Sequence, residues 1–354
     1  RVLFFGNYAG HAGLVDSLWA YGQRMKIMGV KTPFLKLKQA IDYSNLTELK
    51  EDIRQIGKEI EGKGLPAEIG PFICGFFGYG HVSQGAQEIY DLLPAVEIPA
   101  SELVETVEKG YFSLHRVYKV VFKEEDMVKP KGDLVFDLDD YYHHPEKYYP
   151  VTENYLPYLS VLINAIFWTP KYPKFVTRKF LEKLYSGTTQ PRLQVIGDIT
   201  CDINGSIECT VRATDSERPV YVFDPVTGQT LDGFEGYGPV VMAVYNLPAE
   251  LPLESSTYFS QRLKTFIPNL AKADFEQPFE QIELDPVVKR AVIAYRGELA
   301  PDYKYLTEYI EGINILLVTH SPFVLSDLPK SNVLALSRTN EDVVGETFCA
   351  NIQE

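Results

Sequence analysis

The residues best suited to chemistry are the glycines of residues 75–90, GFFGYGHVSQGAQEIY. They are spaced Gly78-x-Gly80-x-x-Ser83, after an apolar strand-like run and at the start of a helix-like segment. In a dinucleotide-binding turn the first glycine permits a tight bend, and the second lets a pyrophosphate approach the backbone. The third residue must be small so that helix and strand can pack, and the helix start offers free N–H groups to phosphate. The pattern predicts a dinucleotide site, although similar glycine turns also occur without a nucleotide.

The choice of cofactor should be visible about 20 residues further on, where an acid at the end of the next strand would bind the ribose 2′-hydroxyl. The next strand-like run is 96–98, and it is followed by Pro99 and small residues. Glu97 lies slightly too early for that role, and no arginine is near. Because a carboxylate would repel a 2′-phosphate, its absence favours NADP(H), with NAD(H) as the alternative.

Other polar residues allow two interpretations. Asp202 precedes Ile-Asn-Gly, which on residue types alone is typical of a turn. Asn246 precedes Leu-Pro and is also compatible with a turn. His143 and His144 could form a metal or catalytic pair, but Pro145 after them favours the start of a helix, where proline is well tolerated.

Strand-like and helix-like segments alternate along the chain. The expected strands are 72–77, 96–98, 117–122, 160–168, 193–199, 220–223 and 240–245. The expected helices are 11–29, 46–61, 83–93, 101–109, 177–185 and 254–272, and 123–145 is expected to be a loop. This alternation predicts an α/β protein with a Rossmann-like, doubly wound parallel sheet.

Composition and charge argue against several classes of function. The chain has 354 residues, enough for about two domains. With 34 basic and 48 acidic residues, its net charge of −14 argues against nucleic-acid or membrane-surface binding. No apolar run approaches the ~20 residues of a membrane span. The four cysteines form neither a disulfide framework nor a zinc spacing, so no metal site is expected. Together with the absence of a signal or transit peptide, they favour a cytoplasmic location.

Several longer stretches resemble the lysine–2-oxoglutarate reductase (saccharopine dehydrogenase, L-lysine-forming) domain of bifunctional aminoadipic semialdehyde synthase. They include GFFGYGHVSQGAQEIYDLLP (75–94), VLINAIFWTPKYPKFVT (161–177), GDITCDINGSIECT (197–210) and VYNLPAELPLESSTYF (244–259). The resemblance is collinear and covers about residues 1–310. It extends more distantly to alanine dehydrogenase and the nicotinamide transhydrogenase domain. The fold that it implies is two Rossmann-like domains with the cofactor in the cleft between them.

The resemblance also implies an activity and a set of site residues. The reaction is the reduction, by NADPH, of the imine of lysine and 2-oxoglutarate to saccharopine, and an alanine-dehydrogenase-like amino-acid dehydrogenase is the alternative. A homo-oligomer is compatible with either. The implied catalytic residues are Asp202 and Asn246. The implied cofactor-binding residues are Gly78, Gly80, His81, Val82, Ser83, Ala165, Ile166, Phe167, Ile199, Asp202 and Leu247.

By the same resemblance the chain divides into four parts. Residues 1–62 hold an interdomain helix and the remnant of a truncated substrate domain, 63–285 the NADP-binding domain, and 286–312 a return segment. The family's acid and base groups lie in a preceding domain, so this chain alone is expected to be a fragment with little or no activity. Residues 313–354 form an unrelated tail, in which 313–340 resemble the switch-histidine segment of an ABC-type or overcoming-lysogenisation-type ATPase, with His320 as the histidine. No phosphate-binding G-x-x-x-x-G-K-[ST] loop accompanies it, so a non-catalytic fusion is a further alternative.

Overall fold

The computed structural model describes residues 4–132, 134–187, 190–307, 334–338 and 343–347. The chain forms two compact units, Arg1–Lys264 and Thr265–Glu354. The division after Lys264 falls within the segment 63–285, which the sequence analysis treats as one domain. The boundaries at 62, 285 and 312 stay predictions.

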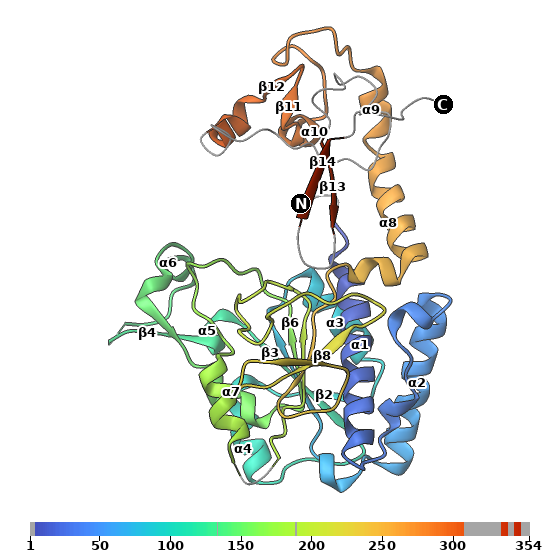
Figure 1. Ribbon diagram of the computed structural model, residues 1–354, viewed down its shortest axis with the longest axis vertical. Coiled ribbons are helices and arrows are strands. Elements are labelled where there is room, and N and C mark those ends of the chain that lie inside the picture. The colour runs from blue at the N-terminus through green and yellow to red at the C-terminus, as the bar shows by residue number, and fades with distance from the viewer. Residues whose placement is uncertain (1–3, 133, 188–189, 308–333, 339–342, 348–354) are drawn as a thin grey trace. The chain divides into compact units, whose positions relative to one another are not determined.

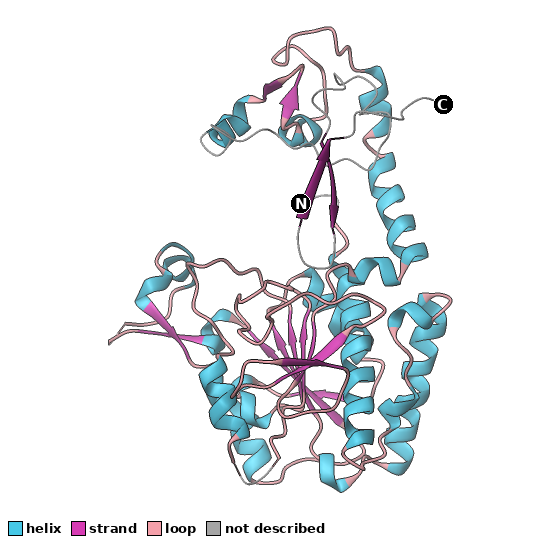
Figure 2. Cartoon of the chain, viewed as in Figure 1, coloured by secondary structure: helices cyan, strands magenta, loops and turns pink. Residues whose placement is uncertain are grey.

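The Arg1–Lys264 unit is built on a sheet of eight strands (Figure 1). From one edge to the other these are β2 (Ala95–Glu97), β3 (Val117–Phe122), β1 (Ile73–Phe77), β6 (Val161–Asn164), β7 (Val195–Asp198), β10 (Val240–Met242), β8 (Val220–Phe223) and β9 (Thr230–Asp232). In this order, the neighbours from β2 through β3, β1, β6 and β7 to β10 are parallel. At the other edge, β8 pairs antiparallel with β10 and β9 pairs antiparallel with β8. Helices cover both faces (Figure 2), so the Rossmann-like doubly wound fold is confirmed.

The order of the strands differs from the chain order at one important place. β2 follows β1 in the sequence but lies at the outer edge, where it pairs with β3. β1 pairs with β3 on one side and with β6 on the other. The strand order therefore reverses between β1 and β6, and in open α/β sheets ligands bind at such a reversal.

Two apolar cores flank the sheet. The helices α1 (Gly6–Ile27), α2 (Leu46–Lys63) and α3 (His81–Tyr90) lie on one face, and α4 (Ala100–Glu108) and α7 (Arg178–Tyr185) lie on the other (Figure 1). Alternate residues of β1 serve the two cores: Cys74 and Phe76 pack on the side of α1, and Ile73 and Phe77 pack on the side of α7. Burial on both faces explains why these strands are continuous apolar runs in the sequence.

α1 is buried almost all round, from Gly10 to Met25. Small residues allow its close contacts: a β-carbon on Gly197 of β7 would lie 2.1 Å from Ser17 Oγ on α1. Arg24 anchors the other end of the helix. Its guanidinium donates to Gln194 Oε1 and to the carbonyls of Phe234, Gly236 and Gly238, so α1 also holds the loop that precedes β10.

Three expected elements are wrong in detail. The strand expected at 160–168 ends at Asn164, because the following apolar residues leave the sheet toward a cavity. The helix expected at 254–272 is two helices, α8 (Pro252–Lys264) and α9 (Ile267–Lys272), with Pro268 in the first turn of the second, where its missing N–H costs little. The loop expected at 123–145 contains α5 (Glu124–Met127), β4 (Val128–Pro130) and α6 (Leu138–His143), each too short to show a period.

The remaining elements are short. β5 (Tyr148–Pro150) pairs antiparallel with β4. Single turns of 3-10 helix are η1 (Pro33–Lys36), η2 (Ala40–Asp42), η3 (Ala67–Ile69), η4 (Pro145–Lys147), η5 (Thr152–Asn154), η6 (Leu156–Tyr158) and η7 (Leu247–Glu250). The second unit contains α9, α10 (Pro286–Ala291), the hairpin of β11 (Ala294–Tyr295) and β12 (Glu298–Leu299), η8 (Pro301–Leu306), and the hairpin of β13 (Leu334–Arg338) and β14 (Val343–Thr347).

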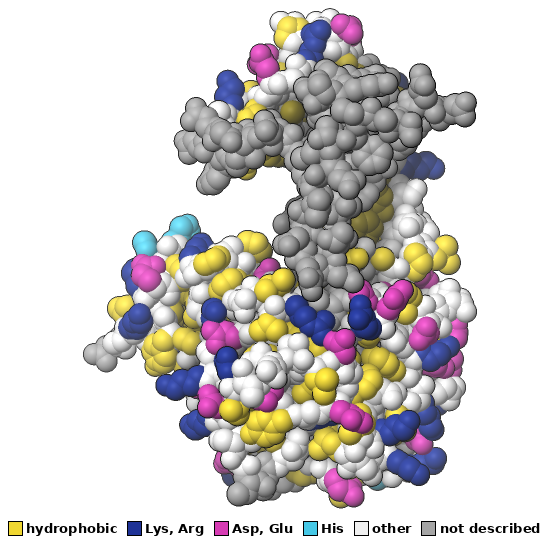
Figure 3. Space-filling view, viewed as in Figure 1, with side chains coloured by type: hydrophobic (Ala, Val, Ile, Leu, Met, Phe, Trp, Pro, Cys, Tyr) yellow, Lys and Arg dark blue, Asp and Glu magenta, His cyan; other side chains and the backbone are white. Residues whose placement is uncertain are grey.

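Among the described helices, none is both long and apolar enough to span a bilayer. On the face of the Arg1–Lys264 unit that Figure 3 shows, acidic and basic side chains are interspersed with apolar ones.

Candidate functional site

The carboxyl ends of four neighbouring strands carry the residues that the sequence assigns to the site. Gly78 follows β1, Ala165 follows β6, Ile199 follows β7, and Asn246 lies shortly after β10. Because these strands are parallel and adjacent, their carboxyl ends lie at one edge of the sheet. The fold therefore gathers the sequence-predicted residues at that edge.

The glycine turn has the geometry that its spacing predicts. Gly78 has a φ of +88°, which side chains disfavour, and its N–H donates to the Phe122 carbonyl at 3.1 Å. A β-carbon on Gly78 would lie 3.2 Å from the Ala165 carbonyl oxygen, so β1 and β6 approach closely here. Gly80 is the N-cap of α3, and a β-carbon there would meet nothing within 4 Å. The space in front of the helix is therefore open to an anion.

His81, Val82 and Ser83 form the first turn of α3. Ser83 is fully buried, and its hydroxyl accepts a hydrogen bond from Gln87 Nε2 at 3.0 Å. Its small side chain thus serves packing. What this turn offers a phosphate is the set of backbone N–H groups that have no partner within the helix.

The loops that follow β7 and β10 both contact α1. A β-carbon on Gly13 would lie 2.6 Å from Ile199 Cγ1 and 3.0 Å from Leu247 Cδ1, so both side chains pack directly on the helix backbone. Leu247 is buried, and Ile199 is half-buried. This packing fixes the positions, relative to α1, of the two loops that carry Asp202 and Asn246.

Both polar candidates lie in turns. The Asp202 carbonyl accepts the Gly205 N–H at 2.8 Å, and Asn204 has a φ of +53°. The Asp202 carboxyl is half-buried, and this burial raises its pKa. Asn246 is exposed, and its carbonyl accepts the Ala249 N–H at 3.0 Å. The turn geometry expected from the residue types is present, and the catalytic roles stay predictions.

A buried polar network supports the loop that carries Asp202. Asn164 Nδ2, at the end of β6, donates to Asp198 Oδ1 at 2.8 Å and to Ser206 Oγ at 3.0 Å. Thr210 donates to the other Asp198 oxygen at 2.6 Å, and the Cys201 N–H donates to Oδ1 at 3.2 Å. Burial nevertheless raises the pKa of Asp198 to about 6. The network thus fixes both ends of the segment 198–210.

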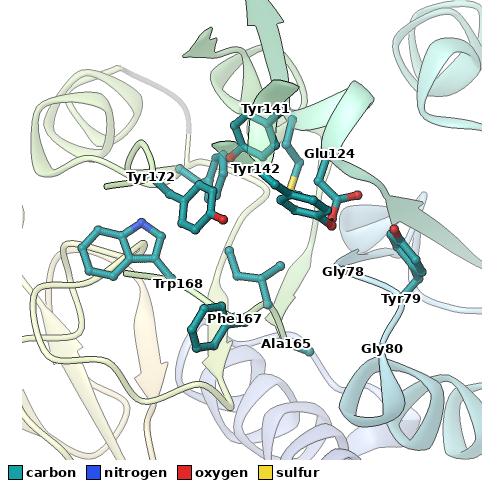
Figure 4. A pocket seen from close by; sticks show the side chains of 13 residues that line it. Gly78, Tyr79, Gly80, Glu124, Tyr141, Tyr142, Ala165, Phe167, Trp168 and Tyr172 are labelled. Atoms are coloured by element: carbon teal, nitrogen blue, oxygen red, sulfur yellow. The ribbon is translucent and has the colours of Figure 1, made fainter. Parts of the chain in front are cut away.

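A cavity of about 350 Å³ opens between the glycine turn, the end of β3 and the segment after β6 (Figure 4). Its lining is mostly apolar and aromatic, as in typical ligand sites. The residues that line it are Gly78, Tyr79, Gly80, Glu124, Met127, Tyr141, Tyr142, Ala165, Ile166, Phe167, Trp168, Tyr172 and Phe175. Ile199, Asp202, Asn246 and Leu247 lie outside this lining.

Glu124 is the charged member of that lining. The Tyr142 hydroxyl donates to Glu124 Oε1 at 2.6 Å. In Figure 4 the carboxyl of Glu124 lies between the rings of Tyr142 and Tyr79. Burial and the nearby Glu124 carboxylate raise the pKa of both tyrosines, so their hydroxyls stay protonated and can donate.

Sequence reasoning found the glycines and residues 165–167 of the cavity but missed Glu124, Tyr141 and Tyr142. The signal for Glu124 was present: an acidic triplet, 124–126, begins two residues after the end of a clear strand. His144 is the N-cap of a 3-10 turn that begins at Pro145, as its sequence context predicts. Among the described residues, no three His, Cys, Asp or Glu side chains gather as metal ligands would. His320 lies outside the described residues.

Residues 151–302 match the family model described as "Alanine dehydrogenase/PNT, C-terminal domain". Over 319 residues the chain is 41% identical to the alpha-aminoadipic semialdehyde synthase of Arabidopsis thaliana, a match that covers 86% of this chain and 29% of that protein. It is 35% identical over 325 residues to the mitochondrial alpha-aminoadipic semialdehyde synthase of Bos taurus, covering 88% of this chain and 35% of that protein. The chain thus spans about a third of the length of these curated relatives.

Two solved structures are similar at low identity. An L-alanine dehydrogenase matches with a TM-score of 0.40 and 15% identity, covering 84% of this chain and 65% of that chain. A transhydrogenase from Sinorhizobium meliloti matches with a TM-score of 0.41 and 13% identity, covering 84% and 62%. The family model ends at residue 302, and none of these matches supports the ATPase resemblance of residues 313–340. The chain is therefore similar over most of its length to one segment of the alpha-aminoadipic semialdehyde synthases, and its residues 151–302 are similar to the C-terminal domain of alanine dehydrogenase/PNT.

Proposed function

We propose that the chain is the cofactor-binding part of an oxidoreductase that reduces the imine of lysine and 2-oxoglutarate to saccharopine. The observation that carries this proposal is the open glycine turn at the reversal of strand order, in a chain 41% identical to an alpha-aminoadipic semialdehyde synthase.

The residues present fit a nicotinamide dinucleotide. Gly80 leaves open space beside the N–H groups that start α3, which suits a pyrophosphate. The aromatic cavity between the ends of β3 and β6 suits an adenosine group. When bound, the cofactor supplies the hydride for the reduction.

The loops after β7 and β10 would then face the reacting end of the cofactor. There Asp202, whose pKa is raised by burial, would exchange a proton with the substrate nitrogen, and the exposed amide of Asn246 would hold the substrate or nicotinamide. These roles follow the family resemblance.

The preference for NADP(H) needs revision. The sequence argument rests on the end of the strand at 96–98 being the neighbour of β1. Because β3 occupies that place, Pro99 does not report on the ribose, and this support for NADP(H) is lost.

A second candidate is an alanine-dehydrogenase-like reductive amination, favoured by the family model at residues 151–302. Assays with lysine plus 2-oxoglutarate and with pyruvate plus ammonia would separate the two. A homo-oligomer and the cytoplasmic location stay predictions; the bovine relative is named mitochondrial.

Calorimetric titration of the chain with NADH and NADPH tests the proposal. We expect at least one to bind with a Kd on the micromolar scale, which is usual for such sites. Gly80→Val should fill the open space and weaken binding about tenfold or more while leaving the melting temperature nearly unchanged. Gly62→Val is the matched control, since a β-carbon there also meets nothing within 4 Å but lies on α2. If the unaltered chain binds neither cofactor, the proposal fails.

A further inference from the structure

A second pocket, of about 230 Å³, lies where the helices α1, α2, α3 and α8 meet. Its walls include Tyr8 and His11 from α1, Lys50 from α2, Glu88 from α3 and Tyr258 from α8, and we call it the helix pocket. All of these helices belong to the Arg1–Lys264 unit. Among the described residues, none lines both this pocket and the cavity beside the glycine turn. A ligand in the helix pocket would therefore lie outside the proposed cofactor site.

One ion pair gives the helix pocket a positive and a negative charge side by side. Lys50 Nζ donates to Glu88 Oε1 at 2.6 Å, and both side chains stay partly exposed. An ammonium has three N–H donors and a carboxylate about four acceptor positions, so each can bind a further group. A simple anion would be repelled by Glu88 and a simple cation by Lys50, whereas a zwitterion can satisfy both.

His11 holds the Glu88 carboxylate from the side of α1. The His11 side chain is buried, and its Nε2 lies 3.0 Å from Glu88 Oε2. Burial lowers the pKa of His11, so the ring is neutral, and its one N–H points to the carboxylate, which can only accept. The other ring nitrogen, Nδ1, is buried and has no hydrogen-bond partner in the described part of the chain. Because such unsatisfied groups are rare in folded proteins, this wall is not arranged for stability alone.

Further polar groups of the helix pocket are unpaired. The side-chain amide of Asn7 and the hydroxyls of Tyr8 and Tyr258 form no hydrogen bond with any described residue. Burial raises the pKa of Tyr8, so its hydroxyl stays protonated and can donate. The rings of Tyr8 and Tyr258 pack edge to face with centroids 5.7 Å apart, and Phe4 and Leu46 add to this apolar surface. The pocket thus combines free donors with an apolar wall, as ligand sites do.

We propose that the helix pocket binds a small zwitterion, an amino acid with an apolar side chain about the size of leucine. Its carboxylate would accept from Lys50 and the free hydroxyls, and its ammonium would donate to Glu88. At the ~30 Å³ of a water molecule the pocket has room for about eight such groups, which suits an amino acid of this size. The inference does not depend on the proposed function.

NMR titration of the chain with three compounds that share one alkyl chain tests the inference. L-Leucine carries both charges, 4-methylpentanoate carries the carboxylate alone, and 3-methylbutylamine carries the ammonium alone. We expect L-leucine to bind with a Kd of about 1 mM or less, and each analogue to bind roughly tenfold or more weakly. Absence of L-leucine binding at concentrations on the order of 10 mM would overturn the inference, as would an analogue that binds equally well.

Two substitutions should change the selectivity in different ways. Lys50→Met should weaken L-leucine binding by about tenfold or more, because it removes the charged donor to the carboxylate. Glu88→Gln should weaken L-leucine but tighten 4-methylpentanoate, because it removes the negative charge that repels a carboxylate; a purely structural effect would weaken both. Lys58→Met, exposed on α2 and outside the pocket, is the matched control and should leave the affinities unchanged. Full L-leucine binding in Lys50→Met would overturn the inference.

A further variant guards against misfolding. Tyr258→Phe keeps the ring that packs on Tyr8 and removes the hydroxyl, so it should weaken L-leucine several-fold at an unchanged melting temperature. Gly80→Val should leave L-leucine binding unchanged, because Gly80 lines the other cavity. Loss of L-leucine binding in Gly80→Val would place the amino acid beside the glycine turn and overturn the inference, whereas failure of NADH and NADPH to bind would overturn only the proposed function.

Discussion

Gly10 of α1 and Gly85 of α3 face each other where the two helices touch. A β-carbon on Gly10 would lie 3.0 Å from the carbonyl carbon of Gly85 and 2.0 Å from the carbonyl oxygen of Val82. A β-carbon on Gly85 would lie 2.2 Å from the Asn7 carbonyl oxygen. The helices therefore pack backbone against backbone, and α1 fixes the position of the helix start that is proposed to bind phosphate.

Gly85→Ala should destabilise the Arg1–Lys264 unit by about 1–3 kcal/mol, because the methyl group must push two backbones apart. Both tryptophans lie in this unit, so their fluorescence during urea unfolding follows it. Gly62→Ala is the control. A β-carbon at this position of α2 meets nothing within 4 Å, and alanine's higher helix propensity should raise the free energy of unfolding by up to about 1 kcal/mol. Equal effects of the two substitutions would contradict the close packing of α1 on α3.

Arg24→Met should lower the free energy of unfolding by about 3 kcal/mol, because it removes the charged donor of three hydrogen bonds to backbone carbonyls. We also expect faster amide hydrogen exchange in 233–238, the loop that Arg24 holds. Arg54→Met is the control, since Arg54 has an ion pair with Glu51 on the surface and should change stability by less than about 0.5 kcal/mol. Unchanged exchange in the loop would show that other contacts hold it.

Asp198 should make the stability of this unit depend on pH. Its pKa is about 6 in the folded chain, mainly through burial, and about 3.9 when unfolded. Between these values the folded state holds more protons, so the free energy of unfolding should fall as pH rises, by at most about 1.4 kcal/mol per pH unit for this one group. Asp198→Asn should flatten the profile between about pH 4 and pH 6. Urea unfolding at several pH values checks this, and parallel profiles would contradict it.

Asp16 of α1 and Glu250 of η7 are two buried acidic residues that lie close to each other. The Asp16 Oδ1 atom accepts the Ala40 N–H and Glu250 Oε1 accepts from Ser216, while Asp16 Oδ2 and Glu250 Oε2 are buried without another partner. Burial, together with the neighbouring acid, raises the pKa of Asp16, and burial raises that of Glu250, so we expect the pair to hold one proton between them when the chain is folded.

Glu250→Gln should therefore be tolerated, because its amide can donate to Asp16 without a proton from solvent. We expect the variant to lose less stability than the parent as pH rises above about 4, where unfolded carboxyls ionise. Thermal unfolding from pH 4 to 8 measures this. Glu217→Gln, at an exposed acid directly after Ser216, the residue that donates to Glu250, should follow the parent profile. A Glu250→Gln variant that is destabilised at every pH would exclude the shared proton.

Local sequence signals predicted the parts of the site that depend on local geometry. The Gly78 turn follows from its glycines, and the helix at Thr177 follows from its capping residue, whose side chain accepts the Phe180 N–H. The sheet class followed from the alternation of strands and helices. These features need no knowledge of which strands become neighbours.

Features that depend on long-range pairing were not predictable. Nothing in the run 95–97 shows that it lies at the edge, since its pattern would suit a place beside β1 equally well. The apolar run 160–168 predicts one long strand, because residues that line a cavity have the same types as core residues. Phe167 is 76% exposed in the structure, so its apolar character serves the cavity and its rim rather than the core.

The outer position of β2 has a practical consequence for reading related sequences. β2 and α4 lie in the sequence between the glycine turn and β3, the true neighbour of β1, so the end of β3 lies far beyond the interval that a motif search would inspect. A search that counts residues would instead examine Pro99, which follows the edge strand β2. Redox engineering of such chains, for example to match a host's reductant supply, should therefore begin with a strand map and alter the residue after the true neighbour of the first strand.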